Sequence, residues 1–183
     1  MTTSVPTIKA GLIGSPGVGK TEFLRYHGYK RDVASDWESV RVLVNKLTKD
    51  EEQNPLVLST NVEFVVRNNL PDLPDDIEAI AVFLDVPSFQ TFFNDLKIMI
   101  KEYSTDIRKR FSHLPTLPIL FYITKYDLFE DTYGISDAIV DNICNYYGCQ
   151  WGGCLSTTKG YHCDYPPKHV KMFCMHTQVT PSP

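Results

Sequence analysis

The sequence lacks any long apolar run, and it lacks an excess of positive charge. No stretch of its 183 residues is apolar over the length that a helix needs to cross a bilayer. The formal net charge is −4, so the surface offers no electrostatic reason to bind nucleic acid or an anionic membrane. Because 43% of the residues are hydrophobic and 22% are charged, the composition is that of a globular protein rather than a disordered one.

Targeting and anchoring signals are not found at the two ends. The first six residues lack the basic patch and the apolar core of a secretory signal. Residue 2 is Thr rather than the Gly that N-myristoylation requires, and the last five residues hold no Cys for prenylation. We therefore expect a cytoplasmic protein with no direct membrane anchor. We also expect a single domain over residues 1–183, with residues 178–183 as a tail.

The five cysteines are an odd number, which fits free thiols in a reducing compartment. Four of them cluster with one histidine, as Cys144, Cys149, Cys154, His162 and Cys163. Such a group could bind zinc. Its spacing matches no zinc motif, so free cysteines in a loop are the favoured interpretation.

Apolar runs alternate with helical patterns along the chain. Strands are predicted at residues 8–13, 55–66, 79–84, 118–123 and 170–175. Helices are predicted at residues 20–26, 36–47, 89–111 and 135–147, and residues 148–167 are expected to be irregular. This alternation predicts an α/β fold with a mostly parallel sheet and helices on both faces. Ligands bind such folds at the carboxyl ends of the strands.

A glycine-rich motif follows the first predicted strand and fits the pattern GxxxxGK[ST] in full. Its residues are Gly14, Ser15, Pro16, Gly17, Val18, Gly19, Lys20 and Thr21. Gly17 and Gly19 let backbone N–H groups point at phosphate oxygens, and the next helix adds its partial positive charge. Lys20 is predicted to contact the β- and γ-phosphates, and the Thr21 hydroxyl to hold Mg²⁺. An ordinary glycine turn is the alternative, but residue type, spacing and context all favour phosphate binding.

A second motif follows the strand predicted at residues 118–123. It fits the pattern [NT]KxD and consists of Thr124, Lys125, Tyr126 and Asp127. The Asp127 carboxylate can accept hydrogen bonds from N1–H and the N2 amino group of guanine, a donor pair that adenine lacks. The Lys125 stem can lie along the base while its ammonium reaches back to the phosphate loop. A charged turn is the alternative, which the presence of the first motif disfavours.

Together the two motifs resemble those of the Ras-like superfamily of P-loop GTPases, and the similarity is greatest to the alpha subunits of heterotrimeric G proteins. Residues 109–111, 118–127 and 128–131 resemble the end of that family's third helix, its fifth strand and the acidic segment that follows. The resemblance covers residues 9–26 and 80–131. It implies a three-layer P-loop NTPase fold, GTP or GDP with Mg²⁺ as ligands, and a protein effector or regulator as partner. It also implies a signalling switch with slow GTP hydrolysis, in which Lys20 acts as a catalytic residue by stabilising charge on the transferred phosphoryl group.

The resemblance implies one further contact, between the guanine oxygen and a backbone N–H. Cys174, Met175 and His176 resemble the loop that makes this contact in alpha subunits, with His176 where that family has Ala. Residues 156–159, Ser-Thr-Thr-Lys, resemble the corresponding loop of small GTPases and are the rival. Because no strand is predicted directly before Ser156, the first loop is preferred.

Several features of the family are not found. No DxxG motif with its Mg²⁺-linked Asp stands near residues 66–69. Asp85 lies too close to Thr124 for that motif, and it suits instead the Asp at the end of the fourth strand of many small GTPases. The chain also has no room between residues 26 and 62 for the helical domain of alpha subunits. The family's C-terminal helix is absent as well, so we expect no receptor coupling.

The first switch of the family has only weak candidates in this sequence. Thr48 or Thr60 could supply a second Mg²⁺-linked hydroxyl, and Arg41 could correspond to the arginine that alpha subunits supply in cis. Roles on a surface helix or loop are favoured for all three residues.

Two alternative functions stay open. The first is a pseudo-GTPase that holds nucleotide, or only keeps the fold, and serves as a docking surface; the missing DxxG motif favours it. The second is a P-loop NTPase that uses another base, with Asp85 as the carboxylate on the Mg²⁺ side.

Overall fold

The computed structural model describes residues 7–26, 39–49, 53, 55–85, 92–125 and 137–156. These residues form a six-stranded sheet with the strand order β2-β3-β1-β4-β5-β6. Its strands are β1 (Thr7–Ile13), β2 (Ser39–Lys49), β3 (Pro55–Val66), β4 (Ala79–Asp85), β5 (Ile119–Thr124) and β6 (Gln150–Leu155). Strand β2 is antiparallel to β3, and all other neighbours are parallel.

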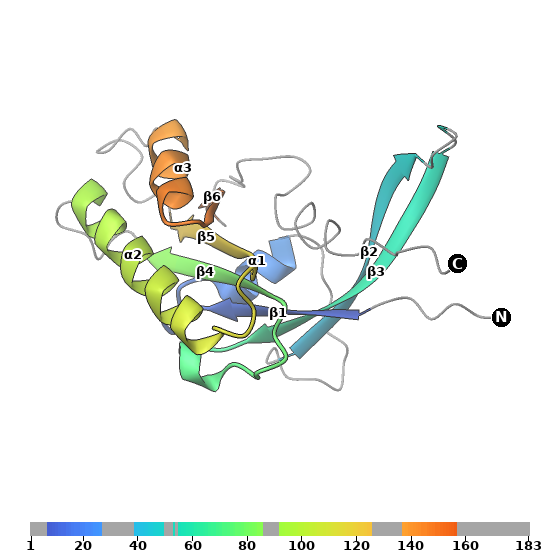
Figure 1. The fold of residues 1–183 in the computed structure, drawn as a ribbon, viewed down its shortest axis with the longest axis horizontal. Helices are drawn as coiled ribbons and strands as arrows, with labels where there is room; N and C mark the ends of the chain where they lie inside the picture. The colour runs from blue at the N-terminus through green and yellow to red at the C-terminus, as the bar shows by residue number, and fades with distance from the viewer. Residues whose placement is uncertain are drawn as a thin grey trace.

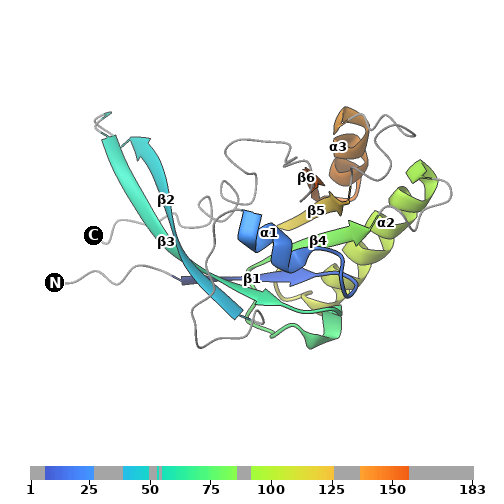
Figure 2. The same cartoon turned by 180° about the vertical axis from the view of Figure 1, so that it is seen from behind.

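Helices cover both faces of this sheet. They are α1 (Lys20–Tyr26), α2 (Phe92–Arg110) and α3 (Asp137–Tyr146), with a short 3-10 helix, η1 (Leu70–Asp72). Helix α1 lies on one face, and α2 and α3 lie on the other (Figures 1 and 2). The expected α/β fold, with a mostly parallel sheet between two helical layers, is therefore confirmed.

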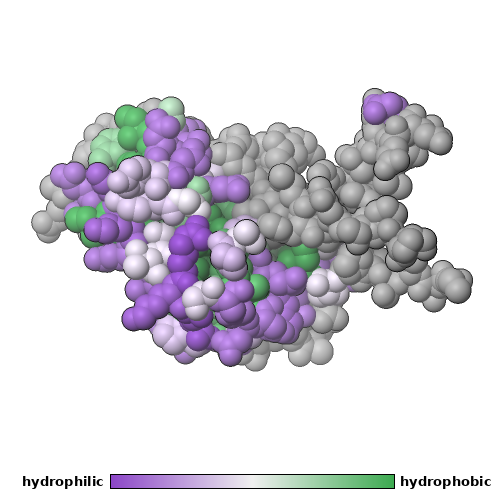
Figure 3. Space-filling model, in the orientation of Figure 1, coloured by the Kyte–Doolittle hydropathy of each residue, from purple (hydrophilic) through white to green (hydrophobic). Residues whose placement is uncertain are grey.

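Two hydrophobic cores lie on the two faces, and strand β4 supplies both. Side chains alternate along a strand, so every second residue of β4 belongs to the same core. The residues that point towards α1 are Ala79, Ala81 and Phe83. Those that point towards α2 and α3 are Ile80, Val82 and Leu84. Figure 3 shows the outer side of α2 and α3 as mainly hydrophilic with separate hydrophobic patches, because most apolar side chains face inward.

Helix α1 is held on the sheet by Phe23. Its ring packs edge-on against Phe83 of β4, with 5.0 Å between the ring centroids, and against Tyr122 of β5 at 5.1 Å. Leu24 is fully buried beside it. Since the Phe23 N–H also donates to the Gly19 carbonyl at 2.9 Å, this packing fixes the loop that precedes the helix.

The prediction of a helix at residues 36–47 is wrong for the residues that the structure describes, because Ser39–Lys49 forms strand β2. It forms a long antiparallel ladder with β3, from Ser39 opposite Val65 to Lys49 opposite Pro55. The apolar residues at helical spacing suggested an amphipathic helix. Valine at positions 40, 42 and 44 also fits the two-residue period of a strand, and its branched side chain favours that alternative.

The prediction of an irregular segment at residues 148–167 is wrong over Gln150–Leu155, because these residues form strand β6. It pairs in parallel with β5, with a register shift near Tyr122. Its two glycines lower the strand propensity of the sequence. A Cβ at Gly152 would lie 2.5 Å from the Tyr122 ring, so the tertiary contact requires a glycine in this strand.

The other predicted elements match the structure to within a few residues, except the strand expected at residues 170–175 and the tail at residues 178–183, which lie outside the described residues. No helix in the described part of the chain is long and apolar enough to span a bilayer.

Three of the five cysteines lie in the described part of the chain; all three are buried, and we expect them to be unreactive in the folded protein. They are Cys144, Cys149 and Cys154. Burial raises the pKa of the Cys149 thiol, and the nearby Arg108 offsets this only in part, so less of the nucleophilic thiolate forms at mildly alkaline pH. A disulfide reagent should therefore label at most two thiols per folded chain and five after unfolding. Fast labelling of three or more thiols would contradict this burial.

Candidate functional site

The glycine-rich loop joins β1 to α1 and lies at the carboxyl edge of the sheet. Its three glycines have positive φ angles, 149° at Gly14, 73° at Gly17 and 106° at Gly19, which residues with a side chain rarely adopt. A Cβ at Gly14 would lie 2.5 Å from the Phe83 carbonyl oxygen. The loop therefore passes directly over β4, and glycine is required there both by conformation and by space.

The other residues of the loop differ in exposure. Ser15, Pro16 and Gly17 are exposed at its tip, and the Val18 side chain is buried. Thr21 is the second residue of α1 and is half-buried. The motif thus presents its tip, residues 15–17, to solvent, while the Val18 side chain holds the base of the loop in the core.

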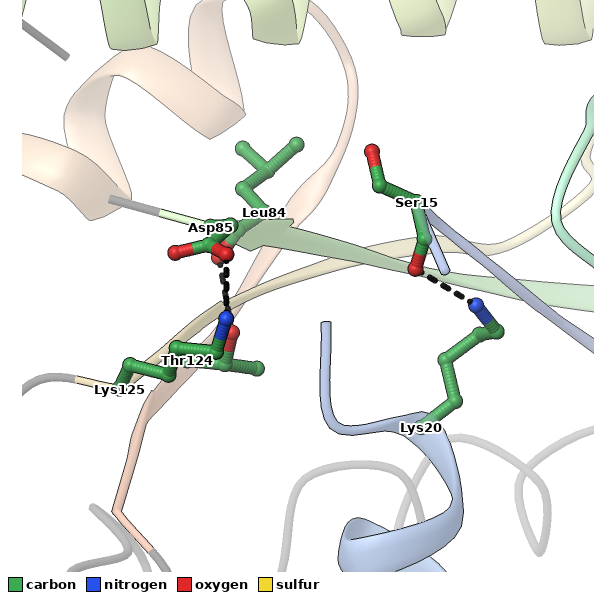
Figure 4. A network of polar contacts seen from close by, with 6 residues as sticks. All are labelled: Ser15, Lys20, Leu84, Asp85, Thr124 and Lys125. Atoms are coloured by element: carbon green, nitrogen blue, oxygen red, sulfur yellow. Dashed lines mark hydrogen bonds and ion pairs between the residues drawn. The ribbon is translucent and has the colours of Figure 1, made fainter. Parts of the chain in front are cut away.

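Lys20 folds back over the loop. Its Nζ donates to the carbonyl oxygens of Gly14 at 2.6 Å and of Ser15 at 3.0 Å, and to Asn68 Oδ1 at 3.1 Å. Figure 4 shows the contact with Ser15. Only 6% of the residue is exposed, and burial lowers the pKa of this ammonium. A positive charge is therefore held against the loop by neutral oxygens, where an anionic ligand would stabilise it.

Thr124, the first residue of the second motif, lies beside the loop. A Cβ at Gly19 would lie 3.7 Å from Thr124 Cγ2. The Thr124 hydroxyl donates to the Leu84 carbonyl at 3.2 Å, which ties the end of β5 to the end of β4. The fold thus brings Thr124, the start of the second motif, to the glycine loop, about a hundred residues away in the sequence.

Lys125 adopts a left-handed backbone conformation, with a φ of 56°. For a residue with a side chain this costs of the order of 1–2 kcal/mol, and such strain concentrates at functional sites. Its ammonium donates to Asp85 Oδ2 at 2.6 Å (Figure 4). The contact expected between this ammonium and the phosphate loop is therefore replaced by an ion pair across the ends of β4 and β5.

The remaining predicted site residues lie outside the described part of the chain. They are Asp127, Cys174, Met175 and His176. Asp127 follows Lys125 by two residues. A strand does precede the rival segment at residues 156–159, contrary to the prediction, because β6 ends at Leu155, directly before Ser156. This segment therefore does begin at the carboxyl edge of the sheet, next to β5.

The candidates for the first switch lie away from the loop. Thr60 precedes Asn61, which is opposite the first residue of β1, so Thr60 is about 20 Å from the carboxyl edge along the strand. Thr48 is opposite Leu56, farther still, and Arg41 is opposite Glu63 within the ladder. All three lie in strands, not on a surface helix or loop, and the register excludes Thr48 and Thr60 as ligands of an ion near Thr21.

The end of β3 carries no carboxylate. Residues 67–69, Arg-Asn-Asn, directly follow this strand, and the Asn68 side chain reaches Lys20. Asp85, at the end of β4, is engaged by Lys125. The described residues hold no group of three or more metal-binding side chains, and Cys163 and His162 lie outside them. Among the described residues, the end of β3 therefore offers no counterpart of the Mg²⁺-linked Asp of the Ras-like family.

The sequence did not reveal two contacts of this site. They are the hydrogen bond between Asn68 and Lys20 and the ion pair between Asp85 and Lys125. A polar residue directly after a strand next to the glycine loop is the signal that could have identified Asn68. No protein-family model matches this chain, and no curated protein shows significant similarity to it.

Proposed function

We propose that this chain binds guanine nucleotides at the carboxyl edge of β1, β4 and β5 and hydrolyses GTP slowly. The observation that carries the proposal is the proximity of the phosphate loop to Thr124, the first residue of the second motif. A Cβ at Gly19, in the phosphate loop, would be in van der Waals contact with Thr124. A ligand with a phosphate chain at one end and a base at the other could reach both motifs from there.

The phosphate end of the proposed ligand rests on the loop and Lys20. The positive φ angles of Gly17 and Gly19 allow consecutive N–H groups to point outward and bind an anion. Lys20 is buried and charged, and its described partners are neutral. Phosphate oxygens would give this ammonium a counter-charge, and the same charge would stabilise the transferred phosphoryl group.

The base end of the ligand is proposed to lie beyond β5. Thr124 and Lys125 are fixed there by contacts to β4, and Asp127 comes two residues later. For the contact to the guanine oxygen, the strand β6 now favours the segment that starts at Ser156 over Cys174, Met175 and His176. A loop directly after a strand beside β5 lies at the edge where the base would sit.

Mg²⁺ would enter this site with the nucleotide, held by phosphate oxygens and the Thr21 hydroxyl. It would supply charge neutralisation to the phosphates, while Lys20 and the loop orient them. Because the end of β3 offers Asn68 rather than a carboxylate, a pseudo-GTPase that retains nucleotide but hydrolyses it little is the second candidate function. Either protein would act as a cytoplasmic signalling switch or docking module toward a protein effector or regulator.

The direct test is to identify the nucleotide that stays with the protein through purification. Titrations of the emptied protein with fluorescent GDP and ATP analogues then measure the preference for the base. Tight binding of GDP and weak binding of ATP would support the proposal, whereas the reverse would support a P-loop NTPase for adenine. Single-turnover release of phosphate separates the slow GTPase from the pseudo-GTPase, since the latter releases little or none over many hours.

Replacing Asp127 with Asn should shift the preference from guanine toward xanthine nucleotides. The carboxylate accepts two guanine donors, whereas an amide can donate to the oxygen that xanthine carries in place of the amino group. A site built for one hydrogen-bond pattern discriminates against the other by about 100-fold or more. Competition between GDP and XDP for the variant measures this shift, and an unchanged preference would contradict the role of Asp127.

A further inference from the structure

Asn68 occupies a position from which its side chain reaches the ammonium of Lys20. The ladder between β1 and β3 continues past Val66, since the Arg67 N–H donates to the Leu12 carbonyl at 2.9 Å. Asn68 is the next residue, and its Oδ1 accepts a hydrogen bond from Lys20 Nζ at 3.1 Å. Any phosphate bound by Lys20 would therefore lie close to this carboxamide.

The charge of this edge is unusual for a site that binds a metal with its nucleotide. Protein sites for Mg²⁺ with phosphates use one or two carboxylates. In the described part of the chain, Lys20 is bonded to three neutral oxygens, those of Gly14, Ser15 and Asn68. The carboxylate at the end of β4, Asp85, pairs with Lys125 at 2.6 Å.

A carboxylate at position 68 would have two effects. It would pair with the Lys20 ammonium and repel the phosphates of a nucleotide, and a bound Mg²⁺ would be needed to overcome that repulsion. A carboxamide has neither effect, because it carries no charge. The identity of residue 68 therefore decides how strongly nucleotide affinity depends on the metal.

We propose that Asn68 makes nucleotide binding by this chain largely independent of Mg²⁺. The inference rests on the proposed nucleotide site, and Asn68 is a positioning residue that holds Lys20 without competing for its charge. The protein should then keep its nucleotide when divalent ions are chelated, because Lys20 and the loop N–H groups carry the binding.

The test is a titration of the nucleotide-free protein with a fluorescent GDP analogue, once in millimolar MgCl₂ and once in excess EDTA. The wild-type dissociation constant should differ by less than about threefold between the two buffers, that is by well under 1.4 kcal/mol. The Asn68→Asp variant should bind about tenfold or more weakly in EDTA and recover in MgCl₂, because the metal then shields the new carboxylate.

Asn69→Asp is the matched control, because it adds the same charge one residue away. Asn69 is exposed, and its Nδ2 donates to Asp72 Oδ2 at 3.1 Å rather than facing Lys20. This variant loses the hydrogen bond to Asp72 and places two carboxylates side by side, which lowers its stability. Its nucleotide affinity should still be independent of Mg²⁺, because the new charge does not face Lys20. Asn68→Ala provides a second variant if Asn68→Asp does not fold. It should bind the GDP analogue about threefold more weakly to the same extent in both buffers, because Lys20 loses one partner and no charge is added.

Three outcomes would overturn the proposal. A wild-type affinity that falls about tenfold or more in EDTA would contradict it while leaving nucleotide binding intact. Equal Mg²⁺ dependence in Asn68→Asp and in wild type would also contradict it. Absence of binding in both buffers, by a protein with a cooperative unfolding transition, would refute the proposed function and this inference together.

Discussion

Replacing Lys20 with Met is expected to weaken nucleotide binding by about 100-fold or more, while the protein keeps its fold. The Lys20 ammonium is the charge at the phosphate loop, and charge-assisted hydrogen bonds contribute about 1.5–3 kcal/mol each. Loss of contacts to two phosphates would remove about twice that energy, which corresponds to a factor of 100 to 10,000 in the dissociation constant.

The same substitution should leave the stability of the nucleotide-free protein nearly unchanged. Lys20 is 6% exposed, and burial lowers its pKa, so its charge is costly in the empty protein. Methionine has a similar length and removes that charge. The loss of three hydrogen bonds from Nζ opposes this gain, and we expect a change in melting temperature of no more than about 4 °C.

Fluorescent GDP titration and thermal unfolding of the two proteins check both statements. Lys101→Met, on the exposed surface of α2, controls for the loss of one positive charge and should affect neither quantity. If Lys20→Met bound GDP as tightly as the control, the ammonium would not contact phosphate, and the nucleotide site would have to be abandoned.

Replacing Gly14 with Ala is expected to destabilise the protein by about 3 kcal/mol or more, from backbone strain and overpacking combined. The φ angle of Gly14 is 149°, and a Cβ there would lie 2.5 Å from the Phe83 carbonyl oxygen. That oxygen belongs to the backbone of β4 and cannot move without disturbing the central sheet. Since a domain is stable by only about 5–15 kcal/mol, this is a large share of the total.

Gly17→Ala is the matched comparison within the same loop. Its φ angle is 73°, but no atom lies within 4 Å of the position that a Cβ would take. This variant should lose only the cost of a left-handed alanine, about 1–2 kcal/mol. Urea unfolding of both variants measures the difference, and similar losses at the two positions would show that the loop does not press against β4 as described.

The sequence predicted the elements whose pattern is local and unambiguous. Strands β1, β4 and β5 are short apolar runs, and α2 has a long helical period, so burial and periodicity point to one structure. The glycine loop was equally clear, because positive φ angles at fixed positions restrict those positions to glycine. These parts were enough to predict an α/β fold and the edge of the sheet at which the glycine loop lies.

Pairing between strands decided the parts that local pattern left ambiguous. In β2, Val40, Val42 and Val44 fit a strand as well as a helix, and the long ladder with β3 selected the strand. In β6, Gly152 weakens the local preference for a strand, and the close approach of Tyr122 accounts for it.

The phosphate loop and the elements around it were determined by the sequence itself, because short-range geometry restricts which residues can stand there. The chemistry around the loop was decided by the tertiary structure. Strand register separates Thr60 from the loop, brings Asn68 to Lys20, and pairs Lys125 with Asp85. These relations depend on the alignment of strands that are distant in the chain, and such alignment is set by packing of the whole sheet rather than by any local pattern.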